Sequence, residues 1–200
     1  RYQFVLPYYD YSSRVYSNRY GTVDFFSNGN NILQNTNNLR TKVINNVNLT
    51  SFNVIEGLKA GGIASVVKNA VISNVVNNGD IMGAFITLGG LVGESNSVNI
   101  SNSYNSDVQL TYTKNSIPNI GGITGTSTGV TNISNVYSLA NIISESDSYS
   151  VIGGITSQAS GTVFNVSNAY VAGNMKSSRN ILSSRIGGIV ASNSLGATAN

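Results

Sequence analysis

The sequence predicts an all-β protein, a parallel β-helix (β-solenoid) of about five to six coils with 28–34 residues in each repeat. Three observations predict this fold. A glycine pair recurs along the chain, a Ser-Asn marker follows most of these pairs at a nearly fixed distance, and the residues between the markers are typical of short strands and turns.

The glycine pair occurs at positions where the chain is expected to start a new coil. Each pair precedes an aliphatic residue: Gly61-Gly62-Ile63, Gly89-Gly90-Leu91, Gly121-Gly122-Ile123, Gly153-Gly154-Ile155 and Gly187-Gly188-Ile189. The second glycines (Gly62, Gly90, Gly122, Gly154 and Gly188) are 28, 32, 32 and 34 residues apart. Glycine there permits either a positive φ or a close approach to the neighbouring coil. The aliphatic residues that follow are expected to stack as a column inside the rod.

The second marker is an asparagine preceded by serine. It occurs at Asn74, Asn102, Asn135 and Asn168, which trail their glycines by 12, 12, 13 and 14 residues. Asparagine tolerates the left-handed backbone conformation, and stacked asparagines form hydrogen-bonded ladders. Tyrosines follow two residues after the last three markers, at Tyr104, Tyr137 and Tyr170, and are expected to stack with their orientation left open. Three further asparagines occupy equivalent places 33 residues apart: Asn99, Asn132 and Asn165.

The composition favours strands over helices. Val, Ile, Thr, Tyr, Asn, Ser and Gly dominate the repeats, whereas strong helix formers are scarce. Coils stacked at the strand spacing of ~4.8 Å would give a rod of roughly 25–30 Å.

Charge and missing residue types narrow the function. Charged residues make up 10% of the 200 residues, and the net charge is +3. The cationic residues are scattered and form no basic stripe, so no nucleic-acid partner is expected. His and Cys are absent, so the sequence predicts no zinc site, no disulfide and no Ser-His-Asp device. No apolar run reaches the ~20 residues of a membrane helix, so no membrane insertion is expected.

Asp80 and Asp107 could form a catalytic acid pair on neighbouring coils, but their interpretation as turn residues is favoured. No cofactor is predicted.

The repeats resemble the GLUG motif. Gly90-Leu91-Val92-Gly93 and Gly122-Ile123-Thr124-Gly125 are similar to its opening, and Ile133-Ser134-Asn135-Val136-Tyr137 and Val166-Ser167-Asn168-Ala169-Tyr170 to its close. The resemblance covers roughly residues 55–200. It implies a repeat region of large bacterial surface proteins, including adhesins, or the non-catalytic β-helical region of zinc metallopeptidases that cleave immunoglobulin A1.

The ends of the chain differ from the repeats. Residues 1–38 are rich in Tyr and Asn and are expected to form an N-terminal cap or a degenerate first coil, with the solenoid in 39–200. An alternative for the tyrosine-rich start is a binding surface around Tyr8, Tyr9 and Tyr11. The fifth unit stops before its Ser-Asn marker, so the chain is expected to be a fragment cut mid-repeat.

The sequence therefore predicts a non-catalytic spacer or docking segment of a large bacterial protein that is secreted or on the cell surface. Expected partners are other domains of the same protein, and a host protein such as immunoglobulin or a glycan. The alternative is an adhesin repeat region that binds host protein or glycan. A carbohydrate-active β-helix enzyme is the third hypothesis.

Overall fold

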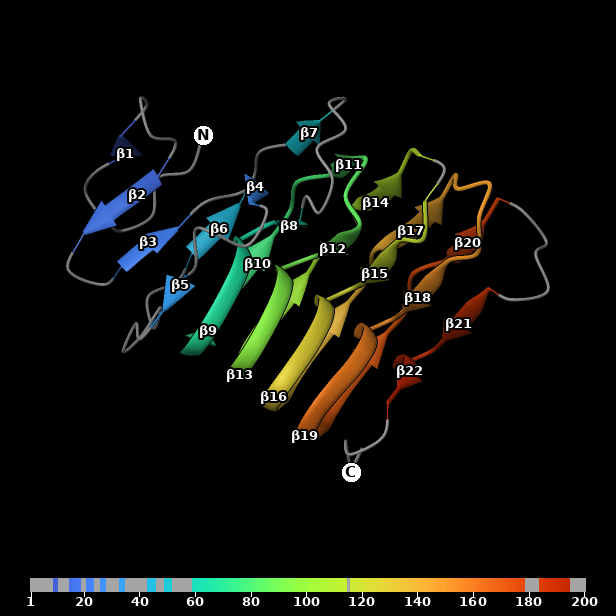
Figure 1. Ribbon diagram of the computed structural model, residues 1–200. Coiled ribbons are helices and arrows are strands. Elements are labelled where there is room, and N and C mark those ends of the chain that lie inside the picture. Colours follow the sequence, from blue (N-terminus) through green and yellow to red (C-terminus); the bar gives the residue numbers. More distant parts are fainter. Residues whose placement is uncertain are drawn as a thin grey trace.

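The computed structural model describes residues 59–114, 116–178 and 184–194 with their side chains, and before residue 59 the backbone of seven short strands. These described residues contain no helix, and their parallel strands stack as a β-solenoid of about four turns (Figure 1). The predicted fold class is confirmed, with fewer turns than the five to six expected. The first three strands form a separate antiparallel sheet: β1 (Tyr9–Asp10), β2 (Val15–Asn18) and β3 (Gly21–Val23).

Three sheets run along the stack. The long sheet contains β5 (Leu33–Gln34), β6 (Val43–Asn45), β9 (Ala64–Ser73), β10 (Val75–Asn77), β13 (Val92–Asn105), β16 (Thr124–Ser138), β19 (Thr156–Val171) and β22 (Val190–Asn193). The second sheet contains β7 (Leu49–Ser51), β11 (Ile81–Gly83), β14 (Gln109–Tyr112), β17 (Asn141–Ser144) and β20 (Met175–Ser177). The third contains β4 (Phe26–Ser27), β8 (Lys59–Gly61), β12 (Thr87–Gly89), β15 (Asn119–Gly121), β18 (Val151–Gly153) and β21 (Arg185–Gly187). All pairings in these sheets are parallel except β4 with β8.

The repeat in the sequence is the register of the solenoid. Gly89 is paired with both Gly61 and Gly121, and the same register continues to Gly153 and Gly187. Successive segments of about thirty residues therefore lie directly on one another, and their backbone hydrogen bonds run from coil to coil.

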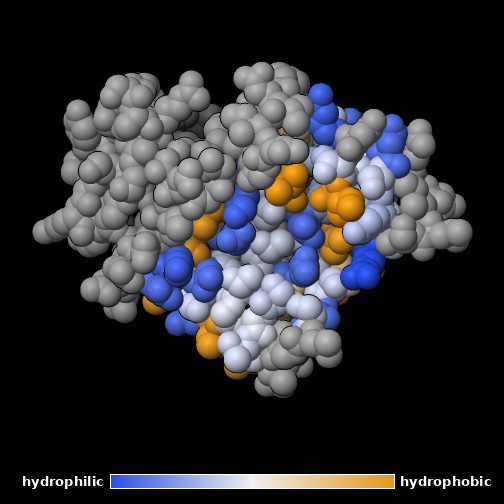
Figure 2. All heavy atoms as spheres, in the orientation of Figure 1, coloured by the Kyte–Doolittle hydropathy of each residue, from blue (hydrophilic) through white to orange (hydrophobic). Residues whose placement is uncertain are grey.

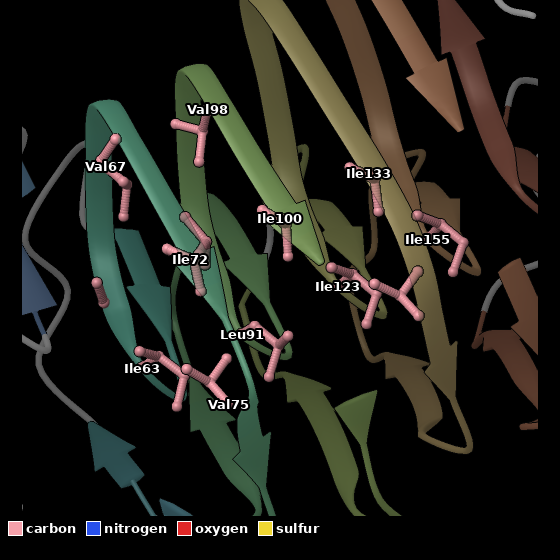
Figure 3. Close-up of a cluster of buried hydrophobic side chains, with 14 of the residues drawn as sticks. Ile63, Val67, Ile72, Val75, Leu91, Val98, Ile100, Ile123, Ile133 and Ile155 are labelled. Carbon is pink, nitrogen blue, oxygen red and sulfur yellow. The ribbon is translucent and has the colours of Figure 1, made fainter. Parts of the chain in front are cut away.

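The aliphatic residues after the glycine pairs form the predicted column (Figure 3). The Ile63 amide donates to the Leu91 carbonyl oxygen at 2.8 Å, and the Ile123 amide donates to the Ile155 carbonyl oxygen at 2.9 Å. All four side chains are fully buried. Each such residue contributes about 1.5–3 kcal/mol relative to an exposed position. Ile189, in the last described coil, is 37% exposed, so the column is incomplete there.

Each long strand bends near its middle, a feature that the sequence analysis did not predict. The bend contains a residue with positive φ in three successive coils: Asn69 (51°), Ser97 (54°) and Gly129 (66°). The register between neighbouring coils also shifts at this point. The two limbs of the bent strands enclose one hydrophobic cluster, which includes Val67 and Ile72 from the same strand (Figure 3).

A second hydrophobic cluster lies between the second and third sheets. It contains Leu88, Ile120 and Ile152 from the third sheet and Ile81, Leu110 and Ile142 from the second, together with Phe85 and Tyr112. Because both clusters repeat in register, each coil buries apolar surface against the coils above and below it.

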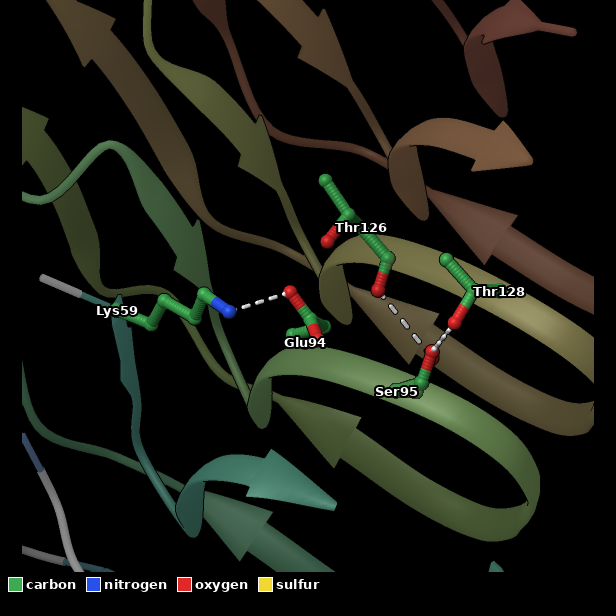
Figure 4. Close-up of polar contacts among 5 residues, drawn as sticks. All are labelled: Lys59, Glu94, Ser95, Thr126 and Thr128. Atoms are coloured by element: carbon green, nitrogen blue, oxygen red, sulfur yellow. Dashed lines mark hydrogen bonds and ion pairs between the residues drawn. The ribbon is translucent and has the colours of Figure 1, made fainter. Parts of the chain in front are cut away.

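Polar side chains inside the described coils are all Ser, Thr or Asn, so no charged group is desolvated there. Their hydroxyls bond between coils: Ser95 Oγ donates to Ser127 Oγ at 2.9 Å, and Thr124 Oγ1 donates to Thr156 Oγ1 at 2.9 Å. On the outside, Lys59 Nζ and Glu94 Oε2 form a 2.7 Å ion pair between β8 and β13 (Figure 4). This pair is partly exposed, so it adds little stability.

Candidate binding surface

The glycine pairs form tight corners between the third sheet and the long sheet. A Cβ on Gly89 would lie 1.8 Å from the carbonyl oxygen of Val92, and one on Gly90 would lie 2.1 Å from that of Gly122. Gly62, Gly122 and Gly154 are confined in the same way, and no glycine of the five pairs has a positive φ. Of the two roles expected for these glycines, close approach therefore applies. Gly188 differs, because its Cβ would meet nothing within 4 Å.

The asparagine markers adopt the left-handed conformation that was expected. Their φ angles are 58° at Asn74, 49° at Asn102, 51° at Asn135 and 49° at Asn168. Asn135 Nδ2 donates to Asn102 Oδ1 at 3.2 Å, and Asn168 Nδ2 donates to Asn135 Oδ1 at 3.0 Å. The predicted ladder is thus confirmed for Asn102, Asn135 and Asn168, on the exposed side of the long sheet.

The left-handed residue changes which side chains face outward. Ile133 and Val136 are buried on either side of exposed Asn135, so the inward positions lie three residues apart instead of two. Tyr137, next along the strand, then points outward. The asparagine is therefore a single-residue irregularity that decides the orientation left open by the sequence.

The tyrosines form an outward column. Tyr104 and Tyr137 are stacked with ring centroids 4.4 Å apart and an angle of 10° between ring planes. Tyr170 is paired with Tyr137 in register and is 61% exposed. Loss of solvation raises the pKa of Tyr137 above its usual value, and repulsion from an ionised Tyr104 raises it further.

A second ladder runs beside the first on the same face. Asn132 Nδ2 donates to Asn99 Oδ1 at 2.8 Å, and Asn165 Nδ2 donates to Asn132 Oδ1 at 2.8 Å. The repeated segments 99–104, 132–137 and 165–170 all have the pattern Asn-x-Ser-Asn-x-Tyr. We call their outward Asn, Ser and Tyr side chains the Asn/Tyr face.

The preceding coil lacks two of these residues. In register with Asn99 and Tyr104 it has Val71 and Val76, and Val76 is 3% exposed. The Asn/Tyr face therefore spans three coils and is interrupted at residues 71–76.

Another asparagine pair lies inside the solenoid, and the sequence analysis missed it. Asn77 and Asn105 are both fully buried, and Asn77 Nδ2 donates to Asn105 Oδ1 at 2.8 Å and to the Gly79 carbonyl oxygen at 2.9 Å. The next coils carry Ser138 and Val171 in this register, and Asn105 Nδ2 has no hydrogen-bond partner. The sequence does contain a pattern for this pair, because Asn77 follows the marker Asn74 by three residues and Asn105 follows the marker Asn102 by three residues.

The two acids considered as a pair have separate partners. Asp80 Oδ1 accepts from the backbone amide of Gln109 at 2.8 Å, and Asp107 Oδ1 accepts from Asn141 Nδ2 at 3.1 Å. Asp80 precedes Ile81, which is paired with Leu110, so Gln109 and not Asp107 is its neighbour in the next coil. The two side chains thus hold turns between coils.

Two other expectations concern parts of the chain that the structure describes only in part. The side chains of Tyr8, Tyr9 and Tyr11 lie outside the described residues, so a binding surface there stays a prediction, as does the domain boundary at residue 38.

Among the residues that are described, no group of three or more His, Cys, Asp or Glu is placed to hold a metal ion. The described residues also include no helix of the length and hydropathy required to cross a membrane.

Comparison of the chain with protein-family models gave no match. Comparison with curated proteins also gave none.

Proposed function

We propose that this chain is a non-catalytic β-solenoid segment that acts as a spacer or docking element in a large bacterial protein, secreted or exposed on the cell surface. The observation that carries the proposal is the unbroken parallel register from β8 to β21, which links every described coil to the next through backbone hydrogen bonds. A stack of this kind is a stiff element of adjustable length, since each added coil extends it by ~4.8 Å.

Two observations support a role without catalysis. The sequence has no His and no Cys, and Asp80, Glu94 and Asp107 each bond a neighbouring group. General acid–base chemistry in a glycosidase requires two carboxyl groups that face a common substrate. Acids occupied in turns and in an ion pair are better explained by stability.

The resemblance of the repeats to the GLUG motif supports the placement in a bacterial surface protein. One version of the proposal is the non-catalytic region of a metallopeptidase that cleaves immunoglobulin A1, in which the segment carries or positions the catalytic domain. The sequence of the whole parent protein would contain a His-Glu-x-x-His stretch in that version. The alternative, an adhesin, is favoured by the exposed Asn/Tyr face.

Removal of one coil tests the spacer role. Deleting residues 122–153 joins Gly121 to Gly154 and keeps the register of all three sheets. The shortened chain should fold, and small-angle scattering should show a longest dimension shorter by ~4.8 Å. In the parent protein, a spacer would tolerate this deletion with its activity retained. Loss of all binding or catalytic activity in a folded deletion variant would contradict a spacer.

A further inference from the structure

We propose that the Asn/Tyr face binds a neutral, linear polysaccharide that lies along the axis of the solenoid. This inference concerns a site on the described coils, and it does not depend on the spacer role. It rests on the chemistry of the exposed side chains, on their repetition and on their lack of charge.

The face has hydrogen-bonding capacity that its own ladders do not use. Asn132 donates one N–H to Asn99 and accepts one from Asn165, and Asn135 is placed in the same way between Asn102 and Asn168. A side-chain amide has two N–H donors and two acceptor lone pairs, so the middle asparagines, Asn132 and Asn135, each keep one of each for a ligand. The ladders also fix the amide orientation, which lowers the entropy lost on binding.

The tyrosines supply apolar contact beside these amides. Stacking of Tyr104 on Tyr137 covers the ring faces between these coils, while both side chains stay partly exposed and Tyr170 is 61% exposed. Tyrosine combines a rigid apolar body with a polar tip and has few rotatable bonds to immobilise. A sugar ring matches this arrangement, because it has C–H groups that pack against ring edges and hydroxyls that bond to amides.

Repetition favours a polymer over a single small molecule. The Asn/Tyr face presents the same group of side chains in three coils, in register and at the strand spacing of ~4.8 Å. A ligand with its own repeat can contact successive coils at once, so its affinity increases with its length. A monosaccharide would gain only one of these contacts.

Charge complementarity favours a neutral ligand. The segments 99–104, 132–137 and 165–170 contain no Asp, Glu, Lys or Arg. An acidic polysaccharide would find no cation on this face, and its charges would lose hydration without compensation. Neutral glucans and mannans, with hydroxyls as their only polar groups besides ring and linkage oxygens, fit the face best.

Calorimetric titration of the full chain tests the proposal. The probes are hexasaccharides and disaccharides of β-1,4-linked glucose, β-1,4-linked mannose and α-1,4-linked glucose, with oligogalacturonate as the acidic probe. We expect at least one neutral hexasaccharide to bind, more tightly than its disaccharide. Its affinity should change less than about twofold when salt is raised, because no ion pair is involved.

Matched variants locate the site. The triple change Tyr104→Val, Tyr137→Val and Tyr170→Val copies Val76 of the preceding coil and should weaken binding at least about tenfold. Tyr149→Val removes a partly exposed tyrosine elsewhere and should leave affinity unchanged. Asn102, Asn135 and Asn168 changed together to Gly keep the left-handed backbone and should weaken binding severalfold. Circular dichroism verifies that each variant is folded. If the triple tyrosine variant does not fold, the single variant Tyr137→Val is used in its place.

Three results would overturn the proposal. They are no binding to any neutral probe, undiminished binding by the folded tyrosine variants, and salt-sensitive binding to the acidic probe alone.

Discussion

Two asparagine ladders in this protein have the same chemistry and different surroundings. The outer ladder, Asn102–Asn135–Asn168, continues through three coils on the exposed face. The inner ladder joins the fully buried Asn77 and Asn105 and then stops, because the next coil has Ser138. The comparison shows that one side chain type serves two purposes: outside it shapes the backbone, and inside it satisfies hydrogen bonds in an apolar environment.

The free-energy cost of losing a hydrogen bond therefore differs between the outer and the inner ladder. An exposed amide that loses its partner bonds to water, so the net value of an outer ladder bond is about 0.5–1.5 kcal/mol. A buried amide without a partner costs its full desolvation, about 1–3 kcal/mol. Asn105 Nδ2 is such a group, so the inner ladder is only partly satisfied where it ends.

The largest effect is expected from filling the space beside the inner ladder. Gly90→Ala would place a Cβ 2.1 Å from the Gly122 carbonyl oxygen and 2.3 Å from Asn105 Nδ2, and backbone atoms cannot yield cheaply. We expect a loss of about 4 kcal/mol or more in the free energy of unfolding, measured by urea denaturation. The control is Gly188→Ala, whose Cβ would meet nothing within 4 Å and should change stability by less than about 0.5 kcal/mol. Equal effects at both positions would contradict the tight corner.

Removing the buried amide should have the next largest effect. Asn105→Ala takes away the acceptor of Asn77 Nδ2 and leaves a small cavity, so the free energy of unfolding should fall by about 2–3 kcal/mol. The converse change, Ser138→Asn, offers Asn105 Nδ2 an acceptor in the next coil and should raise it by about 1 kcal/mol. Thermal and urea unfolding measure both. A destabilised Ser138→Asn variant would show that the inner ladder cannot be extended.

A smaller effect is expected at the outer ladder, and it should come from the backbone. Asn135→Ala places alanine at a φ of 51°, which costs about 1–2 kcal/mol. Asn135→Gly removes the same amide but permits this conformation, so it should recover more than half of the loss in urea denaturation. If both variants lost the same stability, the hydrogen bonds rather than the left-handed backbone would be the main contribution of Asn135.

The smallest effect on stability is expected from the ionisation of two tyrosines, Tyr112 in the interior and Tyr137 on the Asn/Tyr face. Burial raises the pKa of Tyr112 above 10.0, partly offset by hydrogen bonding with Ser116, and loss of solvation raises the pKa of Tyr137 on the outer face. A raised folded-state pKa means that the neutral form is favoured in the folded protein. The resulting stability is complete below pH 10 and is lost as pH rises through the folded-state values.

Melting temperatures between about pH 9 and 12 measure this loss. Tyr112→Phe and Tyr137→Phe each remove one ionisable group and should flatten the alkaline decline, Tyr112→Phe more strongly because Tyr112 is 1% exposed. A steeper decline in either variant would contradict the direction of these pKa shifts.

Much of the fold could be predicted because it depends on repeated residues. The glycine pairs recur where Cβ atoms would collide, and the asparagine markers recur where φ is positive, so selection for local geometry left a visible period. The aliphatic residues after the glycines were predicted correctly for the same reason, except that Ile189 is partly exposed.

Other features leave no such period. The bend of the long strands has Asn69, Ser97 and Gly129 in successive coils, and of these three residue types only Asn and Gly favour a positive φ. Of the candidate surface, the ladder and the tyrosine column were predicted, but their orientation was not. Orientation depends on a one-residue change of alternation at the asparagine, and alternation cannot be read across such an irregularity. The inner asparagines follow their markers by three residues in only two units, because the next two units have Ser138 and Val171 there, so the period is too short to stand out.

The central claim is that segments of about thirty residues lie in register on one another, and contacts between methyl groups test it most directly. With isotopically labelled Ile and Leu methyl groups, nuclear Overhauser effects should connect Ile123 to Leu91 on one side and to Ile155 on the other, because all three are buried in one cluster (Figure 3). All three side chains are fully buried, so these contacts belong to the interior. On the face seen in Figure 2, hydrophobic residues lie among polar ones over the described part of the chain. A spectrum in which Ile123 contacts only residues near it in sequence would contradict the stacked solenoid.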